Sequence, residues 1–493
     1  MTNISSLKFA LFLLSVALLL AASLFSLTGK PPVWFDEGIF LHAGRTLADE
    51  GVFGIQVAPG RFEDLSLVTS GYPLLVPLAL VVKFFGPSIF SARLMMMFFI
   101  LGFAALFFLL AKRLYGTYPA LASALLLASF APLYGNGKSV LGEVPGLFYF
   151  MAGLLFLHRI ETGQAGVDSA RKRYLYSLLA GVGFGLAAST KPLFLLVAGG
   201  VFAAVVVRFQ FWKRHLREFL NVGIGAAITL AVWAGTQFGG SVSIERVLSF
   251  YANPYVLAAG TITTVIKTNA LRFFTESTPI HFAFLFVLCV IFFVSRFRRR
   301  ERVYSSEVAI LVFVLLVLAA YLRTPGWYRY FFTAHVMLFL FLPPVLTRIG
   351  EFIHSRFRLS TGRLATVVLA LLFVVQLGHF IKNEYRYESD TTEPARIHLA
   401  AIPPKKSIMF YNAAELAYLY PRKNFSQYLF FNEGFEVGKE SKDKLASGAF
   451  DVLVVPGANL AEVSGGCYAL EYTARSYVFL TKDPGRCPEA GSL

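Results

Sequence analysis

Long apolar runs alternate with short polar stretches over most of the chain. A helix crosses the hydrocarbon core of a bilayer when about 20 consecutive residues are mostly apolar. The first run is too long for the core of a signal peptide and has no convincing cleavage site, so we count it as a span. Eleven runs are predicted to span, at about 7–27, 94–111, 118–134, 144–158, 175–189, 192–207, 219–237, 279–295, 307–322, 328–346 and 364–381.

One further apolar run, Pro73–Gly86, is about 14 residues long, which suits an interfacial or re-entrant helix better than a span. If it does not cross, the five interior loops hold 19 Lys and Arg, against 11 in the much longer outer loops. If it crosses, RFRRRER at 296–302 faces outward, against the positive-inside rule. We therefore predict a cytoplasmic N-terminus, eleven spans and an outward C-terminus.

The pattern changes near Lys382, where the chain becomes polar. Strand-like runs lie at Ser407–Tyr411, Asp451–Val455 and Tyr468–Leu480, and a helical stretch (AAELAYLY) follows the first of them. Strands mixed with short helices indicate a small α/β domain. We predict a membrane domain over 1–381, with an outer loop at 28–92, and an extracytoplasmic α/β domain over 382–493.

Composition agrees with the hydropathy pattern: 56% of the 493 residues are hydrophobic and only 15% are charged. A soluble globule of this length has no interior large enough for so much apolar surface. The net charge of +16 is explained by cytoplasmic loops, so RFRRR at 296–300 is predicted to be a membrane anchor and no nucleic-acid partner is expected. The chain has three Cys, of which Cys467 and Cys487 could pair if their domain faces an oxidising compartment.

Candidate chemistry begins just beyond the first span, in the stretch VWFDEG. Asp36 and Glu37 are expected in the membrane interface, where an acidic pair is costly unless it has a function. Such a site could hold a carboxylate suited to act as a general base. The alternative is that Asp36 caps the helix predicted to follow, with Glu37 in its first turn.

The next outer loop contributes Lys138 and Glu143, the latter at the start of the fourth span. Helix-start chemistry alone explains an acidic residue there. The topology, however, places Glu143 on the same membrane face as Asp36. Two acidic groups that converge at one interface favour a functional site.

Three cations are expected on that face: Lys191 between two spans, and Arg329 at the start of the tenth, with Arg323 just before it. Snorkelling toward the headgroups is the ordinary explanation. Outer cations are depleted by the positive-inside rule, and a group of them suits a lipid-borne phosphate or pyrophosphate. The eight His have no metal-ligand spacing and there is no CxxC pair, so we predict no metal site or cofactor. A divalent metal remains an alternative that nothing in the sequence supports.

These motifs resemble the GT-C membrane glycosyltransferases, and among them the dolichyl-phosphate-mannose protein mannosyltransferase and aminoarabinose transferase type. The resemblance covers about residues 7–350, and it rests on the order and common outward side of the motifs. The matching stretches are WFDEG, the Pro-rich segment 71–94 ending at FG and Arg93, KRLYG at 112–116, GEVPG with Glu143, STKP with Lys191, and WYRYFF with Arg329 and Tyr330.

The resemblance implies transfer of a sugar from a polyprenyl-phosphate sugar to a protein, lipid or glycan acceptor at the outer face of a bacterial plasma membrane. It makes Asp36 the general base. Glu37 and Glu143 would orient acceptor or donor, and Lys191 and Arg329 would hold the phosphate leaving group. In one respect the chain departs from the aminoarabinose transferases: Gly71 and Tyr72 stand where those carry an acidic and a basic residue.

By the same resemblance, Arg93 and Tyr330 are candidate binding residues, and Lys138, in the same outer loop as Glu143, is a further one. Two alternatives to this function stay open. One is another lipid-linked transferase, such as an O-antigen ligase or a phospholipid-headgroup transferase. The other is a transporter or flippase, which should place ionisable groups near mid-span. Here the ionisable residues gather at the outer ends of the spans, which favours an interfacial active site.

Overall fold

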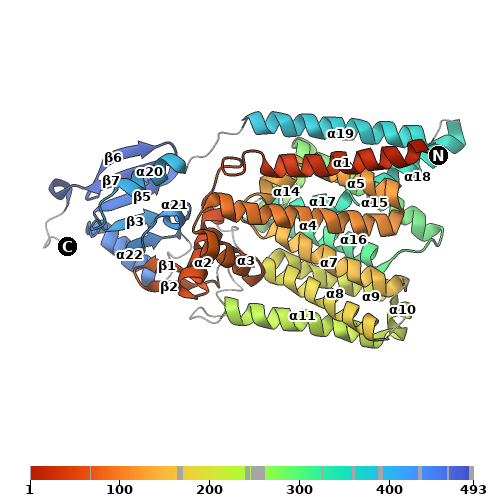
Figure 1. Cartoon of the computed structure of the whole chain (residues 1–493), viewed down its shortest axis with the longest axis horizontal. Coiled ribbons are helices and arrows are strands. Elements are labelled where there is room, and N and C mark those ends of the chain that lie inside the picture. The colour runs from red at the N-terminus through yellow and green to blue at the C-terminus, as the bar shows by residue number, and fades with distance from the viewer. Residues whose placement is uncertain are drawn as a thin grey trace.

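Helices dominate the computed structural model, and a small sheet lies beyond one end of them (Figure 1). The N-terminus lies at the opposite end of the helix bundle from that sheet (Figure 1). The structure describes residues 2–66, 68–163, 170–238, 245, 261–324, 326–357, 361–386, 392–430, 436–463 and 466–487.

Each of the eleven predicted apolar runs is helical. The helices of the bundle are α1 (Thr2–Leu24), α4 (Ile89–Tyr115), α5 (Thr117–Ala128), α6 (Ala131–Gly137), α7 (Glu143–Thr162), α8 (Ala170–Thr190), η1 (Pro192–Leu196), α9 (Val197–Val207), α10 (Phe209–Arg214), α11 (Leu216–Gln237), α14 (Ile262–Thr275), α15 (Ser277–Arg298), α16 (Ser305–Tyr321), α17 (Arg329–Leu338), α18 (Leu342–Phe357) and α19 (Thr361–Arg386).

The predicted number of eleven spans is not confirmed. Within the described part of the chain, five helices are long and apolar enough to cross a membrane. The number rises to seven if two bent pairs count as one span each: α5 with α6, at 62°, and α17 with α18, at 50°. Other predicted runs form helices that are shorter or less apolar than this test requires, because apolar content does not reveal where a helix breaks.

Glycines let α8 pack closely against its neighbours in the stretch GVGFG at 181–185. A Cβ at Gly181 would collide with the backbone of Val222 in α11, and one at Gly183 would lie 2.8 Å from the nitrogen of Gly153 in α7. Small residues allow this close approach of backbones between membrane helices. The glycine-rich stretch therefore serves helix packing.

The segment after α1 folds at the end of the bundle nearest the sheet (Figure 1). It forms α2 (Phe35–Glu50), an antiparallel hairpin of β1 (Gly54–Ala58) and β2 (Arg61–Asp64), and α3 (Tyr72–Phe85). Helix α3 is the predicted interfacial run, and its 14 residues are too few for a span. Asp36 and Glu37 thus lie at the start of α2, the first element of the layer between the bundle and the sheet.

The C-terminal region is α/β, as predicted, with a five-stranded sheet in the order β4-β3-β5-β7-β6. The first three strands run parallel, and β7 and β6 form an antiparallel hairpin. Cys467 and Cys487 pair in a disulfide. The helices and strands of the C-terminal region are α20 (Glu393–Ala401), β3 (Ile408–Tyr411), α21 (Ala414–Leu419), β4 (Phe425–Tyr428), α22 (Glu436–Ala446), β5 (Val452–Pro456), α23 (Leu460–Val463), β6 (Tyr468–Ala474) and β7 (Tyr477–Lys482).

Candidate functional site

Helix α2 begins at Phe35, and Asp36 lies in its first turn. The residue in the N-cap position is Trp34, with an extended backbone, and no side-chain hydrogen bond caps the helix. The interpretation of Asp36 as the helix cap is therefore wrong. Its carboxylate forms an ion pair with Arg329, at the first residue of α17. The Asp36 side chain remains 28% exposed.

Aromatic rings surround the guanidinium of Arg329. Its central carbon lies 4.5 Å from the ring centre of Trp34, 4.8 Å from that of Trp327 and 5.2 Å from that of Tyr330. Such cation–π contacts stabilise a cation that has lost part of its water. Arg329 also donates a hydrogen bond of 3.4 Å to the hydroxyl of Tyr330. The aromatic rings hold the guanidinium against Asp36.

A second ion pair joins Glu143 and Lys191, both nearly buried. Glu143 is the first residue of α7, as the helix-start interpretation required, but its carboxylate also binds the Lys191 ammonium. Lys191 connects α8 to η1. The pKa of Lys191 is lowered, chiefly by burial. Arg329 adds to this shift, and Glu143 and Asp36 oppose it. The two carboxylates and the two cations therefore interact electrostatically with one another.

Glu37 points in a different direction from Asp36. Its carboxylate forms a two-pronged ion pair with Arg93 of α4, at 2.9 Å and 2.7 Å, and neither side chain is exposed. Arg93 also donates to the carbonyl of Pro31, at 2.8 Å, and Glu37 accepts from the backbone nitrogen of Val140, at 3.0 Å. The pair ties α2 to α4 and to two loops.

Lys138 is buried as well, being only 1% exposed. Its ammonium donates a 2.8 Å hydrogen bond to the carbonyl of Phe25, just beyond α1. The described residues contain no group of three or more His, Cys, Asp or Glu placed to hold a metal ion. The structure thus brings together four of the predicted charged residues, Asp36, Glu143, Lys191 and Arg329, with Tyr330 beside them.

The comparisons with known proteins point to one fold. The family model of the dolichyl-phosphate-mannose-protein mannosyltransferases matches residues 70–253. Among solved structures, ArnT from Cupriavidus metallidurans bound to undecaprenyl phosphate is similar, with a TM-score of 0.62 and 13% identity over 97% of this chain and 99% of that one. The chain has the GT-C fold.

A second similar structure is the oligosaccharyltransferase of Archaeoglobus fulgidus in complex with zinc and sulfate. Its TM-score is 0.55 and its identity 14%, over 96% of this chain and 74% of that one. ArnT in the apo state gives a TM-score of 0.60. No curated protein sequence matches the chain. The resemblance to GT-C glycosyltransferases that the motifs predicted is confirmed.

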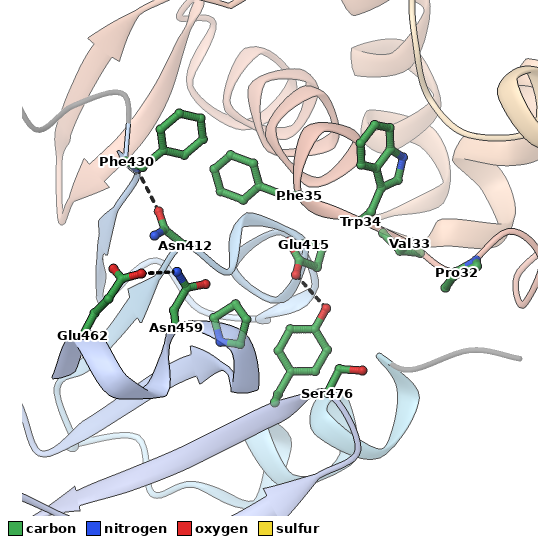
Figure 2. A pocket seen from close by; sticks show the side chains of 12 residues that line it. Pro32, Val33, Trp34, Phe35, Asn412, Glu415, Phe430, Asn459, Glu462 and Ser476 are labelled. Carbon is green, nitrogen blue, oxygen red and sulfur yellow. Dashed lines mark hydrogen bonds between the residues drawn. The ribbon is translucent and has the colours of Figure 1, made fainter. Parts of the chain in front are cut away.

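A cavity of about 630 Å³ opens next to the charged cluster of this GT-C fold, between the start of α2 and the C-terminal sheet (Figure 2). It is lined by Pro32, Val33, Trp34, Phe35, Asn412, Glu415, Phe430, Pro456, Asn459, Glu462, Ser476 and Tyr477. Sequence reasoning missed this wall because its polar residues lie in the C-terminal domain, far along the chain. The signal that could have indicated it is the helical stretch AAELAYLY, which places Glu415 among apolar residues.

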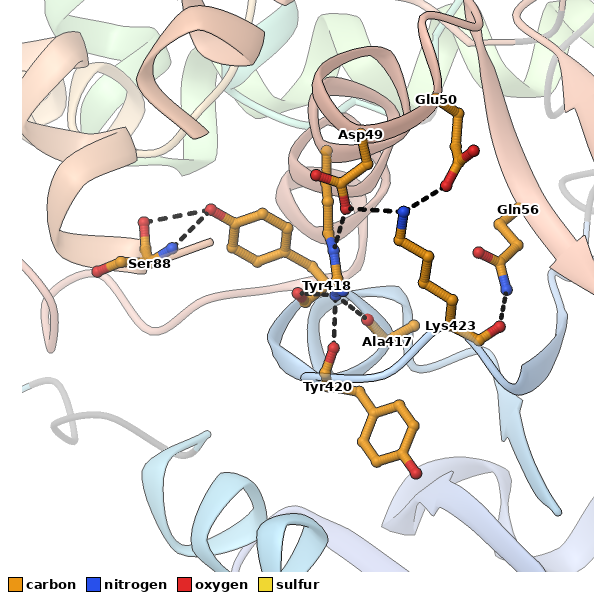
Figure 3. A network of polar contacts seen from close by, with 9 residues as sticks. Asp49, Glu50, Gln56, Ser88, Ala417, Tyr418, Tyr420 and Lys423 are labelled. Carbon is orange, nitrogen blue, oxygen red and sulfur yellow. Dashed lines mark hydrogen bonds and ion pairs between the residues drawn. The ribbon is translucent and has the colours of Figure 1, made fainter. Parts of the chain in front are cut away.

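A network of polar contacts fixes the C-terminal region to α2 (Figure 3). Arg45 of α2 donates to the carbonyls of Tyr418, at 2.8 Å, and Tyr420, at 2.5 Å, at the end of α21. A cation at a helix C-terminus satisfies carbonyls that have no partner within the helix. The Tyr418 hydroxyl accepts from the backbone nitrogen of Ser88, at 2.9 Å. These contacts hold α2 and α21, which both contribute to the cavity wall, against each other.

Proposed function

We propose that the protein is a glycosyltransferase that moves a sugar from a polyprenyl-phosphate donor to an acceptor at the outer face of the membrane. The observation that carries this proposal is the cluster of Asp36 with Arg329 and of Glu143 with Lys191. It offers one partly exposed carboxylate beside two cations, which is the combination that a base and an anionic leaving group require.

The reaction is a direct displacement at the anomeric carbon of the donor sugar. Asp36 accepts the proton of the acceptor nucleophile as the new glycosidic bond forms. The bond between the anomeric carbon and the phosphate oxygen breaks, and its electron pair leaves with the polyprenyl phosphate. Lys191 and Arg329 stabilise the negative charge that develops on this leaving group.

Arg329 has two anionic partners available in this scheme. One is Asp36, with which its guanidinium forms an ion pair. A bound phosphate offers a second anion with oxygens suited to the fork of the guanidinium. A shift of Arg329 toward the phosphate would release the Asp36 carboxylate for the acceptor, so that donor binding prepares the base.

Glu37 was predicted to act beside Asp36, and Arg93 and Lys138 to bind substrate. Their burial supports a positioning role instead, in which Glu37 and Arg93 set the direction in which the first turn of α2 presents Asp36. Removing one partner of a buried ion pair costs about 3–5 kcal/mol. The pair is therefore expected to matter for folding more than for substrate contact.

Two similarities support the donor class. The matching family model describes transferases whose donor is a lipid-phosphate sugar, and the similar ArnT structure contains undecaprenyl phosphate. We further propose that the chain resides in the plasma membrane, with a cytoplasmic N-terminus and an outer C-terminal domain. The opposite ends at which Figure 1 draws the N-terminus and the sheet are consistent with that orientation.

The function is tested with the full chain in proteoliposomes that contain undecaprenyl phosphate carrying a radiolabelled sugar. Membrane extracts supply the acceptors. A glycosyltransferase releases one undecaprenyl phosphate for each label that appears in a new product. A transporter would move the labelled lipid across the bilayer without releasing the phosphate, and a ligase would transfer only from a pyrophosphate donor. Either result would exclude the proposed function.

A further inference from the structure

The cavity beside the charged cluster has no role in the displacement described above. Trp34 connects the two places, because its ring packs against the Arg329 guanidinium and also lines the cavity. Asp36 follows Phe35, another lining residue, by one position. A molecule that fills the cavity therefore reaches the edge of the reactive cluster.

The walls combine aromatic rings with amide and carboxylate groups (Figure 2). Phe35 and Phe430 lie together, with ring centres 5.3 Å apart, and Phe430 is 51% exposed. Rings that are open on one face can pack against the apolar face of a sugar ring. The other lining residues add Asn412, Asn459 and Glu462, whose groups bind hydroxyls.

None of the twelve described residues that line the cavity carries a positive charge. Two of them, Glu415 and Glu462, are acidic. A phosphate would meet repulsion there rather than the cations it requires. The cavity therefore does not suit the phosphate of the donor, which belongs with Lys191 and Arg329. It suits a neutral or amino sugar.

Glu415 places a buried carboxylate in the cavity wall. Its side chain is 3% exposed, and one carboxylate oxygen accepts a 2.6 Å hydrogen bond from the hydroxyl of Tyr477. The other oxygen, Oε2, is buried and has no hydrogen-bond partner among the described residues. A buried acceptor without a donor is costly, at about 1–3 kcal/mol, and a ligand hydroxyl or ammonium would satisfy it.

We propose that this cavity binds a sugar residue of the acceptor, so that the acceptor is a glycan or glycolipid whose terminal sugar carries no phosphate. The C-terminal region supplies Glu415, Asn459 and Phe430 for recognition, and α2 supplies the aromatic wall that leads to Asp36. The identification of the bound sugar as part of the acceptor rests on the proposed function. The existence of the sugar site does not.

The test measures binding of simple sugars to the full chain in lipid nanodiscs, without donor, by saturation-transfer NMR. The probes are methyl glucoside and methyl glucosaminide, with glucose 1-phosphate and phosphoethanolamine as contrasts. Saturation of the ring protons of a glycoside is expected. The two phosphates can also bind at Lys191 and Arg329, so Phe430→Ala should leave their signals unaltered. If neither glycoside binds, or if Phe430→Ala lowers the phosphate signals as much as the glycoside signals, the proposed sugar site is wrong.

Phe430→Ala is expected to reduce the glycoside signal at least about fivefold, since one aromatic contact contributes about 1 kcal/mol. Glu415→Gln should also weaken it, because an amide donor replaces one acceptor oxygen. Phe84→Ala is the matched control: Phe84 is 75% exposed on α3 and is not part of the cavity wall. Equal signals from Phe430→Ala and the unaltered chain would contradict the proposal.

Asp36→Asn separates this inference from the proposed function. It should bind the glycosides as the unaltered chain does while transferring no sugar. If it transfers at the normal rate and still binds glycosides, the catalytic assignment fails and the sugar site stands. If it is inactive and the glycosides bind nowhere, the sugar site fails and the catalytic assignment stands.

Discussion

Arg45→Ala is expected to release the C-terminal region from α2. The side chain of Arg45 is 8% exposed, and it donates to the carbonyls of Tyr418 in α21 and of Tyr420 just beyond that helix. The truncation leaves the carbonyls of Tyr418 and Tyr420 without their guanidinium partner for as long as the region stays docked. The docked state therefore loses free energy, whereas the undocked state, in which water reaches those carbonyls, does not.

The magnitude follows from the two bonds. A hydrogen bond to a charged group contributes about 1.5–3 kcal/mol, so the loss is about 3–6 kcal/mol. Because about 1.4 kcal/mol corresponds to a factor of ten, undocking becomes at least about a hundredfold more frequent. Lys423→Ala provides the matched control in the same network. Its ammonium lies 2.5 Å from Glu50, but its side chain is 56% exposed, and such surface pairs contribute less than about 1 kcal/mol.

Hydrogen exchange measured by mass spectrometry on the full chain reports on this opening. Amides of α21 and β4 should exchange at least about a hundredfold faster in Arg45→Ala, in line with the free energy above, while Lys423→Ala changes them less than about tenfold. The amides of α7 in the bundle serve as an internal reference. Unchanged exchange in α21, or equal acceleration by both variants, would refute the role of Arg45.

Three further predictions concern the charges of the site, the pH dependence and the topology. Lys191→Gln should raise the KM for the donor at least about tenfold, by loss of one charged contact to the phosphate, whereas Lys83→Gln, an exposed lysine of α3, should leave the KM unchanged. Burial raises the pKa of Glu415 to about 7 from its ordinary value of 4.5, so the folded chain binds that proton more tightly than the unfolded chain. Stability should therefore fall by up to about 3 kcal/mol as pH rises through this range, and a Tm that falls as steeply in Glu415→Gln would contradict this. Arg299→Cys should react with an impermeant maleimide only in inverted vesicles and Ala458→Cys only in right-side-out ones; the opposite pattern would reverse the topology.

Hydropathy predicted where the helices lie, because apolar side chains in a bilayer require a helix to satisfy the backbone. It could not predict how many of them span. The break between α5 and α6 falls at Ser129 and Phe130, just before Pro132 in the first turn of α6. A proline interrupts the hydrogen bonds of a helix, but hydropathy does not register it, and the angle of the bend depends on packing with other helices. The short strand β4 was missed for a similar reason, since Phe425–Tyr428 is stabilised as a strand by its partner β3.

The residue types of the site were predictable, but their pairings were not. Asp36 and Arg329 are 293 positions apart, and only the packed bundle brings them together. Asp36 and Glu37 are adjacent, which made them look like one acidic unit. Successive residues on a helix point about 100° apart, so Asp36 contacts Arg329 while Glu37 turns to Arg93. The sequence alone carries no sign of that division.

The central claim is that Asp36 is the base for a displacement at the donor sugar. The most direct measurement is a single-turnover assay of Asp36→Asn in nanodiscs, with binding of the polyprenyl-phosphate sugar measured on the same sample. Asparagine keeps the shape but accepts no proton, so transfer should slow by about 10²–10⁴-fold, while the donor still binds. Transfer at the rate of the unaltered chain would contradict the account.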